Sequence, residues 1–237
     1  MAEAHPPQSS TPISPSSPIW VLGAGRFGEL ALKRLTRRLP DTDITVIDVR
    51  QDKLDRLRSE YGSPHMSILQ GDGLNRMNRD DLPEGLWIVP AVPKHVAFAW
   101  FVNRLNVVGK ATVLPVPTEL DGQVPNPYRV EDGTVYASHA TFLCPDSCSE
   151  PEDICTYTKR PRATNLFEVI SRVQVPGYRV LVVRSRQLAP GVGGYPIVQL
   201  RKTLDQISAH EGRFVIATSC RCHGVINAMN WEPRSTG

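Results

Sequence analysis

Short apolar, β-branched runs alternate with segments of helical periodicity along most of this 237-residue chain. The first example is IWVLGAGRFGELALKRLTRRL, which begins at Ile19 with an apolar run and continues through a glycine-rich turn into a helix. In that helix Phe27, Ala31, Leu35 and Leu39 recur every four residues, so we expect them to share one buried face. Strands that alternate with helices predict an α/β fold built on a mostly parallel sheet, with helices on both faces.

The alternation continues to the C-terminus with one interruption. The apolar runs predict strands from residue 19 and at residues 44–49, 66–69, 86–89, 111–114, 134–143, 178–184 and 214–218. Helical spacing predicts helices at residues 26–39, 51–61, 94–108, 164–173 and 197–207. The interruption, residues 115–161, is rich in Pro, Asn and Gly and is predicted to be mostly irregular. The glycine-rich segment 188–196 is read as a strand-to-helix connection, or as a loop whose amides face an anion.

The Pro- and Ser-rich residues 1–18 lack apolar periodicity and are predicted to be a disordered tail. Residues 19–237 are predicted to form a single α/β domain. Within it we expect a nucleotide-binding half at 19–115, an irregular cysteine-bearing segment at 116–160 and a second α/β half at 161–237.

Composition excludes several classes of function. The net charge of +3 is too small and too mixed for a phosphate-binding stripe, so nucleic acid is not an expected partner. The chain contains no apolar run near the roughly 20 residues of a membrane-spanning helix, and its start does not resemble a signal peptide. We therefore expect a cytoplasmic protein without direct membrane insertion, and either a homodimer or a larger complex remains open.

The glycine turn carries the clearest motif. Gly23, Gly25 and Gly28 form G-x-G-x-x-G between an apolar strand and a helix. In this pattern the first glycine makes a tight turn, the second admits a pyrophosphate close to the backbone, and the third allows close packing of helix on strand. The context predicts a doubly wound, Rossmann-like sheet with a dinucleotide site; the alternative is a glycine-rich turn that binds nothing.

Asp48 ends the second strand twenty positions after Gly28. A carboxylate there accepts hydrogen bonds from the adenosine ribose and repels a 2′-phosphate, so the expected cofactor is NAD(H) rather than NADP(H). Arg50 nearby weakens this preference.

Residues 19–75 resemble the NAD-binding regulatory domains of potassium uptake systems and potassium channels, the Trk-type or regulator-of-conductance family. The resemblance is carried by IWVLGAGRFGELALKRL, ITVIDVRQDKLDRL and ILQGDGLN. It implies that Asp48 holds the ribose, that Arg26 lies near the phosphates, that Asp72 approaches the adenine side, and that the protein regulates potassium transport. The candidate cofactor-binding residues are Gly23, Gly25, Arg26, Phe27, Gly28, Asp48 and Asp72.

All five cysteines fall in two groups that each follow a predicted strand. The candidate metal ligands are Cys144, Cys148 and Cys155, in C-P-x-x-C-x6-C, and Cys220, Cys222 and His223, in C-x-C-H. Because ligands of open α/β sheets gather beyond the carboxyl ends of strands, the two groups are expected at one edge, where thiolates would suit zinc or an iron–sulfur cluster. The alternative is a set of ordinary buried thiols.

Two functions from different classes remain open. The protein is either an NAD(H)-binding sensor or regulatory subunit, which we favour, or an NAD-dependent oxidoreductase with a cysteine-bound iron–sulfur or zinc centre. His95 and His139 are weaker candidates for acid–base chemistry, since a lone histidine is more often packed or solvated. Trp87, Trp100 and Phe101 lie in apolar runs and are expected in the core.

Overall fold

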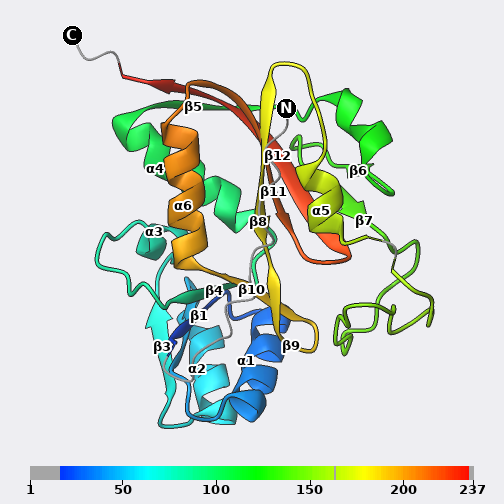
Figure 1. The fold of residues 1–237 in the computed structure, drawn as a ribbon. Coiled ribbons are helices and arrows are strands. Elements are labelled where there is room, and N and C mark those ends of the chain that lie inside the picture. Colours follow the sequence, from blue (N-terminus) through cyan, green and yellow to red (C-terminus); the bar gives the residue numbers. More distant parts are fainter. Residues whose placement is uncertain (1–16, 163, 235–237) are drawn as a thin grey trace.

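The computed structural model describes residues 17–162 and 164–234. They form an α/β fold with two mixed sheets rather than the single mostly parallel sheet expected from the sequence (Figure 1). Most of the predicted tail, residues 1–16, lies outside the described residues.

The first sheet has the strand order β3-β2-β1-β4-β10-β9. Its strands are β1 (Ile19–Leu22), β2 (Ile44–Asp48), β3 (Met66–Gln70), β4 (Trp87–Pro90), β9 (Arg186–Ala189) and β10 (Val192–Pro196). Strands β1 to β4 are parallel to one another, with Ile19 in register with both Ile44 and Trp87. β10 is antiparallel to β4 and to β9.

The second sheet has the order β6-β7-β12-β11-β8, and β5 also pairs with β12. Its strands are β5 (Gly109–Leu114), β6 (Tyr128–Arg129), β7 (Val135–Ser138), β8 (Tyr178–Arg184), β11 (Gly212–Ser219) and β12 (His223–Pro233). Only β8 and β11 are parallel neighbours; the other pairs of this sheet are antiparallel.

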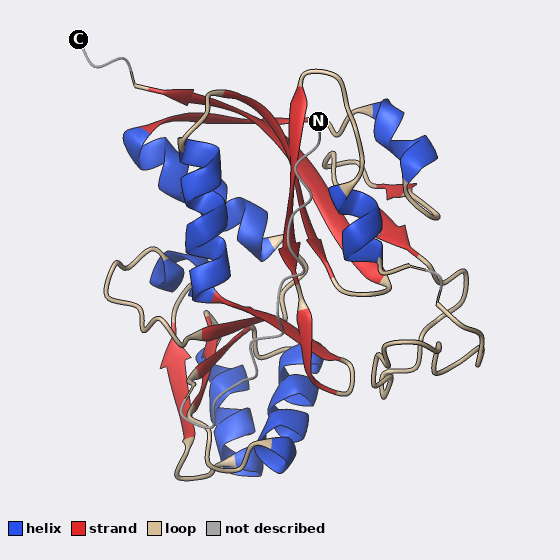
Figure 2. Ribbon diagram, viewed as in Figure 1, coloured by secondary structure: helices blue, strands red, loops and turns tan. Residues whose placement is uncertain are grey.

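Helices separate and cover the two sheets, as Figure 2 shows. The helices are α1 (Arg26–Arg38), α2 (Gln51–Tyr61), α3 (Gly73–Met77), α4 (Val96–Val108), α5 (Leu166–Ser171) and α6 (Ile197–Ser208), with a 3₁₀ helix η1 (Thr118–Gln123). Helices α1 and α2 pack on one face of the first sheet. Helices α4 and α6 lie between the two sheets, and α5 and η1 cover the far face of the second sheet.

Three hydrophobic clusters follow from this layering. The central cluster joins Leu22 and Ile88 of the first sheet to Phe214 and Trp231 of the second, through the fully buried Phe101 of α4. Burial of such side chains stabilises a fold by about 1.5–3 kcal/mol each. The tryptophan and phenylalanine side chains assigned to the core, Trp87, Trp100 and Phe101, are all buried, so that prediction is confirmed.

Three sequence expectations about local structure are wrong, and one strand was not expected. Phe27 does not face the core but is 62% exposed, because Gly28, rather than Phe27, faces the sheet at the first turn of α1. The 188–196 segment is a hairpin of β9 and β10, not a plain connection. The strand predicted at residues 111–114 is β5, which joins the second sheet, and the 11-residue β12 was not predicted. In the last three cases, hydrogen bonds to a strand from the C-terminal part of the chain determine the observed structure.

Candidate functional site

The glycine turn has the geometry that its motif predicts. Gly23 has φ of +109°, and a Cβ atom there would lie 2.8 Å from the Ala91 carbonyl oxygen. A Cβ on Gly28 would lie 1.8 Å from the Gly23 carbonyl oxygen, so only glycine permits this approach of helix to strand. A Cβ on Gly25 would meet nothing within 4 Å. The middle glycine therefore faces open space beside the start of α1, where first-turn amides lack intrahelical partners.

Asp48 lies at the end of β2, next to this turn. Its Oδ2 accepts the Ala24 amide at 2.7 Å, and its Oδ1 accepts the Arg50 amide at 2.8 Å. The carboxylate thus fixes the turn and keeps lone pairs for a further donor. Asp72 caps α3 by accepting the Asn75 amide at 3.0 Å, and it lies directly after β3.

Arg26 is the first residue of α1, and its guanidinium lies 3.4 Å from Asp146 in an exposed ion pair. Phe27, next to it, lines the cavity described below. Arg34 of the same helix donates to the carbonyl oxygens of Pro190, at 2.7 Å, and of Asp146. The cysteine-bearing segment therefore lies against α1, near the glycine turn.

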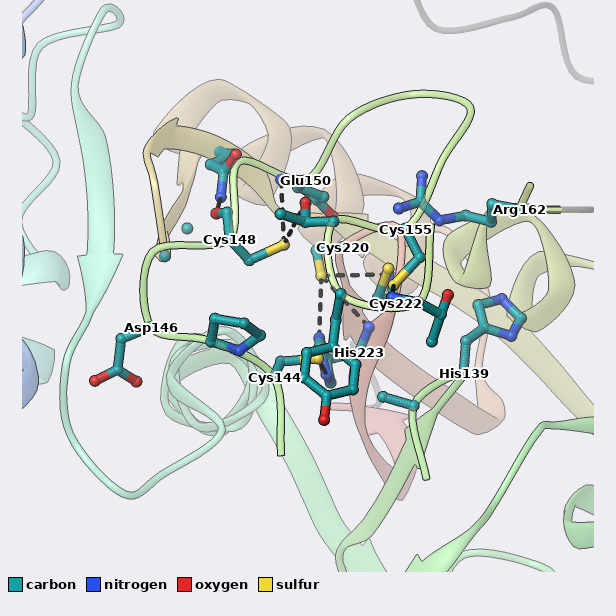
Figure 3. A pocket seen from close by; sticks show the side chains of 18 of the residues that line it. His139, Cys144, Asp146, Cys148, Glu150, Cys155, Arg162, Cys220, Cys222 and His223 are labelled. Carbon is teal, nitrogen blue, oxygen red and sulfur yellow. Dashed lines mark hydrogen bonds between the residues drawn. The ribbon is translucent and has the colours of Figure 1, made fainter. Parts of the chain in front are cut away.

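The two cysteine groups meet at one cavity of about 480 Å³, which all five cysteines and His223 line (Figure 3). The expectation that both groups lie at one place is confirmed. Cys220 and Cys222 belong to the tight turn between β11 and β12, closed by the Cys220 amide, which donates to the His223 carbonyl oxygen at 2.9 Å. The cavity is bounded on the α1 side by Phe27 and Leu30.

Backbone bonds and charges hold the irregular segment on this turn. Both Gly191, through its amide, and Gln187, through its side chain, donate to the Cys148 carbonyl oxygen. Glu150 accepts the Arg221 amide, and Glu152 pairs with the Arg221 guanidinium. These two carboxylates, which crowd the first cysteine loop in the sequence, therefore tether it to the second group.

Backbone amides and a histidine point at the sulfurs. The Glu150 amide lies 3.4 Å from Cys148 Sγ, and the Thr158 amide lies 3.5 Å from Cys155 Sγ. Cys220 Sγ accepts two amides, those of Cys222 at 3.5 Å and His223 at 3.4 Å. The ring of His223 lies between two thiols, with Nε2 3.5 Å from Cys144 Sγ and Nδ1 3.9 Å from Cys220 Sγ.

The thiols differ in their ionisation. Burial raises the pKa of Cys144, and the neighbouring Cys148, Cys222 and Cys155 raise it further. Burial also raises the pKa of Cys220 and Cys222. The hydrogen bonds from Thr158 lower the pKa of Cys155.

Within residues 17–162 and 164–234, no group of three or more His, Cys, Asp or Glu side chains is placed to hold a metal ion as the structure stands. In the same described ranges no helix is long and apolar enough to cross a membrane.

The two weaker histidine candidates have different surroundings. Both ring nitrogens of His95 are hydrogen bonded, to Asn227 and Thr218, and burial lowers its pKa to about 4. His95 therefore has a structural role. His139 lines the cysteine cavity, its Nε2 is a buried atom without a hydrogen-bond partner among the described residues, and burial lowers its pKa.

A family model described as "Uncharacterized protein, C-terminal domain" (AF_1314_C) matches residues 97–232. The chain belongs to this family. The family match runs from α4 into β12, and so it includes both cysteine groups and the second sheet as far as Glu232. A curated protein of Archaeoglobus fulgidus, named "Uncharacterized protein", is 28% identical over 222 residues, which cover 88% of this chain and 97% of that protein.

Sequence reasoning missed several residues of the site. Arg221 and Arg162 hold the irregular segment together; the Arg162 guanidinium donates to the carbonyl oxygens of Pro151 and Glu152. The position of Arg221 inside the C-x-C-H motif was the available signal. Phe142 and Tyr157, whose rings stack at 4.4 Å, have no pattern that predicts their contact.

Proposed function

We propose that the protein binds NAD(H) at the Gly23–Gly28 turn and acts as a sensor or regulatory subunit. The observation that carries the proposal is that each of the three glycines has a different structural role. Gly23 makes the turn, Gly28 permits close packing, and Gly25 leaves free the volume that a pyrophosphate would fill. The first-turn amides and the dipole of the 13-residue α1 favour an anion at this position.

Three further features support the proposal. The parallel order β3-β2-β1-β4 agrees with the first four strands, 3-2-1-4, of the dinucleotide-binding strand order, and the glycine turn follows β1, as the proposal requires. The Asp48 carboxylate, which holds the Ala24 amide, keeps lone pairs that would accept hydrogen bonds from a ribose, and Arg26 extends from the first turn of α1 with 81% of its side chain exposed. A bound NAD(H) would supply a hydride-carrying redox couple, so that occupancy could report its reduction state.

The test is titration of the full-length protein with NADH, followed by fluorescence. Gly25→Val places a branched side chain in the space left for the pyrophosphate, and the φ of −79° at Gly25 accepts valine, so the fold should persist. We expect binding to be lost. Gly122→Val is the matched control, since a Cβ there also meets nothing within 4 Å but the residue lies in η1. Undiminished affinity in folded Gly25→Val would refute the proposal.

A role in potassium transport follows only from the resemblance of residues 19–75. It extends the proposal in one direction: NAD(H) occupancy would control a potassium transporter. Its test is co-purification with a potassium uptake protein from the native cell, with Gly25→Val as the comparison.

An oxidoreductase is the second candidate. The proximity of the cysteine cavity to α1 favours it, because Phe27 and Leu30 line that cavity and Arg26 contacts Asp146 of the cysteine segment. NADH consumption with an artificial electron acceptor would distinguish it from a sensor, which binds NADH without turnover.

A further inference from the structure

The cysteine cavity is distinct from the glycine turn, and its chemistry is not explained by NAD(H) binding. Segments that lie about 65 residues apart in the sequence place five thiols around one volume of about 480 Å³. Core packing does not account for this arrangement, because every one of the five thiols is only partly buried and lines the cavity. We propose that Cys144, Cys148, Cys155 and Cys220 bind an iron–sulfur cluster of the [4Fe–4S] type in this cavity.

The backbone around three of these sulfurs supports the assignment. Cys148, Cys155 and Cys220 each accept at least one main-chain amide, at 3.4–3.5 Å. Amide donors aimed at sulfur stabilise the anionic thiolate, and hydrogen bonds of this kind surround the ligands of iron–sulfur clusters and tune their potential. Such donors bring no comparable gain to a neutral thiol in a core, since S–H is a weak hydrogen-bonding group.

The contacts of the His223 ring favour a cluster over a single metal ion. Its two nitrogens contact different sulfurs, Cys144 at Nε2 and Cys220 at Nδ1, so the imidazole lies between the two sulfurs. Around a tetrahedral zinc ion, with Zn–S bonds near 2.3 Å, two thiolates would be only about 3.8 Å apart. In a cluster each thiolate binds a different iron, so the ligand sulfurs are farther apart than around zinc, and the His223 ring has to turn out of the space between Cys144 and Cys220 to admit the cluster.

The same contacts select Cys220 rather than Cys222 as the fourth ligand. The spacing C-x-C-H leaves both available, but Cys220 accepts two amides of its own turn. The Cys222 sulfur instead has a side-chain donor, the Arg162 guanidinium, and among the described residues no main-chain amide or histidine nitrogen donates to it. Cys222 is therefore assigned to the cavity wall, and it provides a matched control two residues from a proposed ligand.

The first experiment is analysis of full-length protein purified without oxygen. We expect about four iron and four acid-labile sulfide per chain, and a broad absorption near about 400 nm that dithionite bleaches. Stoichiometric zinc without iron, or protein without metal that also fails to take up ferrous iron and sulfide under reducing conditions, would overturn the proposal. Neither measurement involves NADH, so this proposal and that of NAD(H) binding succeed or fail separately.

The second experiment assigns the ligands with single serine variants. We expect Cys144→Ser, Cys148→Ser, Cys155→Ser and Cys220→Ser each to lose more than about nine-tenths of the iron, whereas Cys222→Ser keeps the parent content. Circular dichroism establishes that each variant is folded. If Cys222→Ser loses the iron and Cys220→Ser retains it, the ligand assignment is wrong. The spectrum of the parent protein tests the cluster even where a variant fails to fold.

Discussion

The stability of this protein should depend on pH through His95, which precedes α4. Its Nδ1 lies 2.8 Å from Asn227 Oδ1, and its Nε2 lies 2.8 Å from Thr218 Oγ1. Asn227 uses its Nδ2 to donate to Thr134, at 2.9 Å, so its Oδ1 is the atom that faces the histidine. Because Asn227 Oδ1 can only accept, Nδ1 donates to it, and in the neutral ring Nε2 accepts from the Thr218 hydroxyl. A second ring proton, on Nε2, would require the Thr218 hydroxyl to rotate and accept the bond that it now donates, and it would place a charge in a buried site.

The magnitude follows from the pKa of the ring. Burial lowers the pKa of His95 from 6.5 to about 4, and the bond to Asn227 only partly opposes this effect. Between these two values the unfolded chain binds a proton that the folded chain excludes, so the free energy of unfolding falls as the pH falls from about 6.5 to about 4. The difference between the two pKa values corresponds to about 3 kcal/mol, which is a large part of a typical stability of about 5–15 kcal/mol.

Urea denaturation at pH 7 and about pH 4 measures this loss. His95→Gln removes the titrating ring but keeps a donor and an acceptor, so it should lose about 3 kcal/mol less than the parent protein over this interval. His210→Gln, at an exposed position after α6, is the control and should follow the parent protein. Parallel loss of stability in the parent and in His95→Gln would refute the reasoning, because burial would then not keep the ring neutral.

Three other substitutions test other parts of the structure. Gly28→Ala should destabilise the fold by about 1–3 kcal/mol in thermal unfolding, because its Cβ would overlap the Gly23 carbonyl oxygen, whereas Gly25→Ala should stay within about 0.5 kcal/mol of the parent; equal effects would contradict the turn geometry. Asp48→Ser should weaken NAD binding by about 1–2 kcal/mol and shift the binding preference toward NADP, as measured by calorimetry. An unchanged ratio of the NAD and NADP affinities would show that Asp48 does not contact the ribose. Trp100→Phe should cost about 1–3 kcal/mol in urea denaturation, because the buried Met77 carbonyl oxygen loses the Trp100 indole donor at 2.9 Å; an unchanged midpoint would contradict this.

The sequence predicted the first sheet best, because its parallel strands are marked by local patterns. The run at Ile44 and the helical spacing of Leu54 and Leu57 place β2 and α2 within about one residue of their observed bounds. The α/β class follows from this alternation alone and is confirmed. Which sheet a strand joins depends on distant partners, which is why the strand predicted at residues 111–114 was assigned to a single sheet with β1 to β4 rather than to the second sheet.

β10 and β12 were missed because their residues carry weak strand signals. β10 contains Gly193 and Gly194, and glycine usually weakens a strand; here a Cβ on Gly194 would lie 2.8 Å from the Ile88 carbonyl oxygen, so the close approach of β4 requires it. In β12 the buried Asn227 breaks the apolar alternation, and only its bonds to His95 and Thr134 make it acceptable in a core. Neither reason can be seen in the local sequence.

The position of the two cysteine groups was predicted from the rule that ligands gather beyond the carboxyl ends of strands. β7, β8 and β11 run in the same direction, since β11 is parallel to β8 and both β7 and β11 are antiparallel to β12. The chain therefore leaves β7 at Ser138 and β11 at Ser219 on one edge, and the residues that follow reach the same cavity. The rule predicts that both cysteine groups lie at one edge of the sheet, but it does not predict the order of the strands. The rule does not indicate which of Cys220, Cys222 and His223 would be the fourth ligand of the proposed cluster. That depends on which sulfur the amides of the tight turn face, and only the folded backbone determines this.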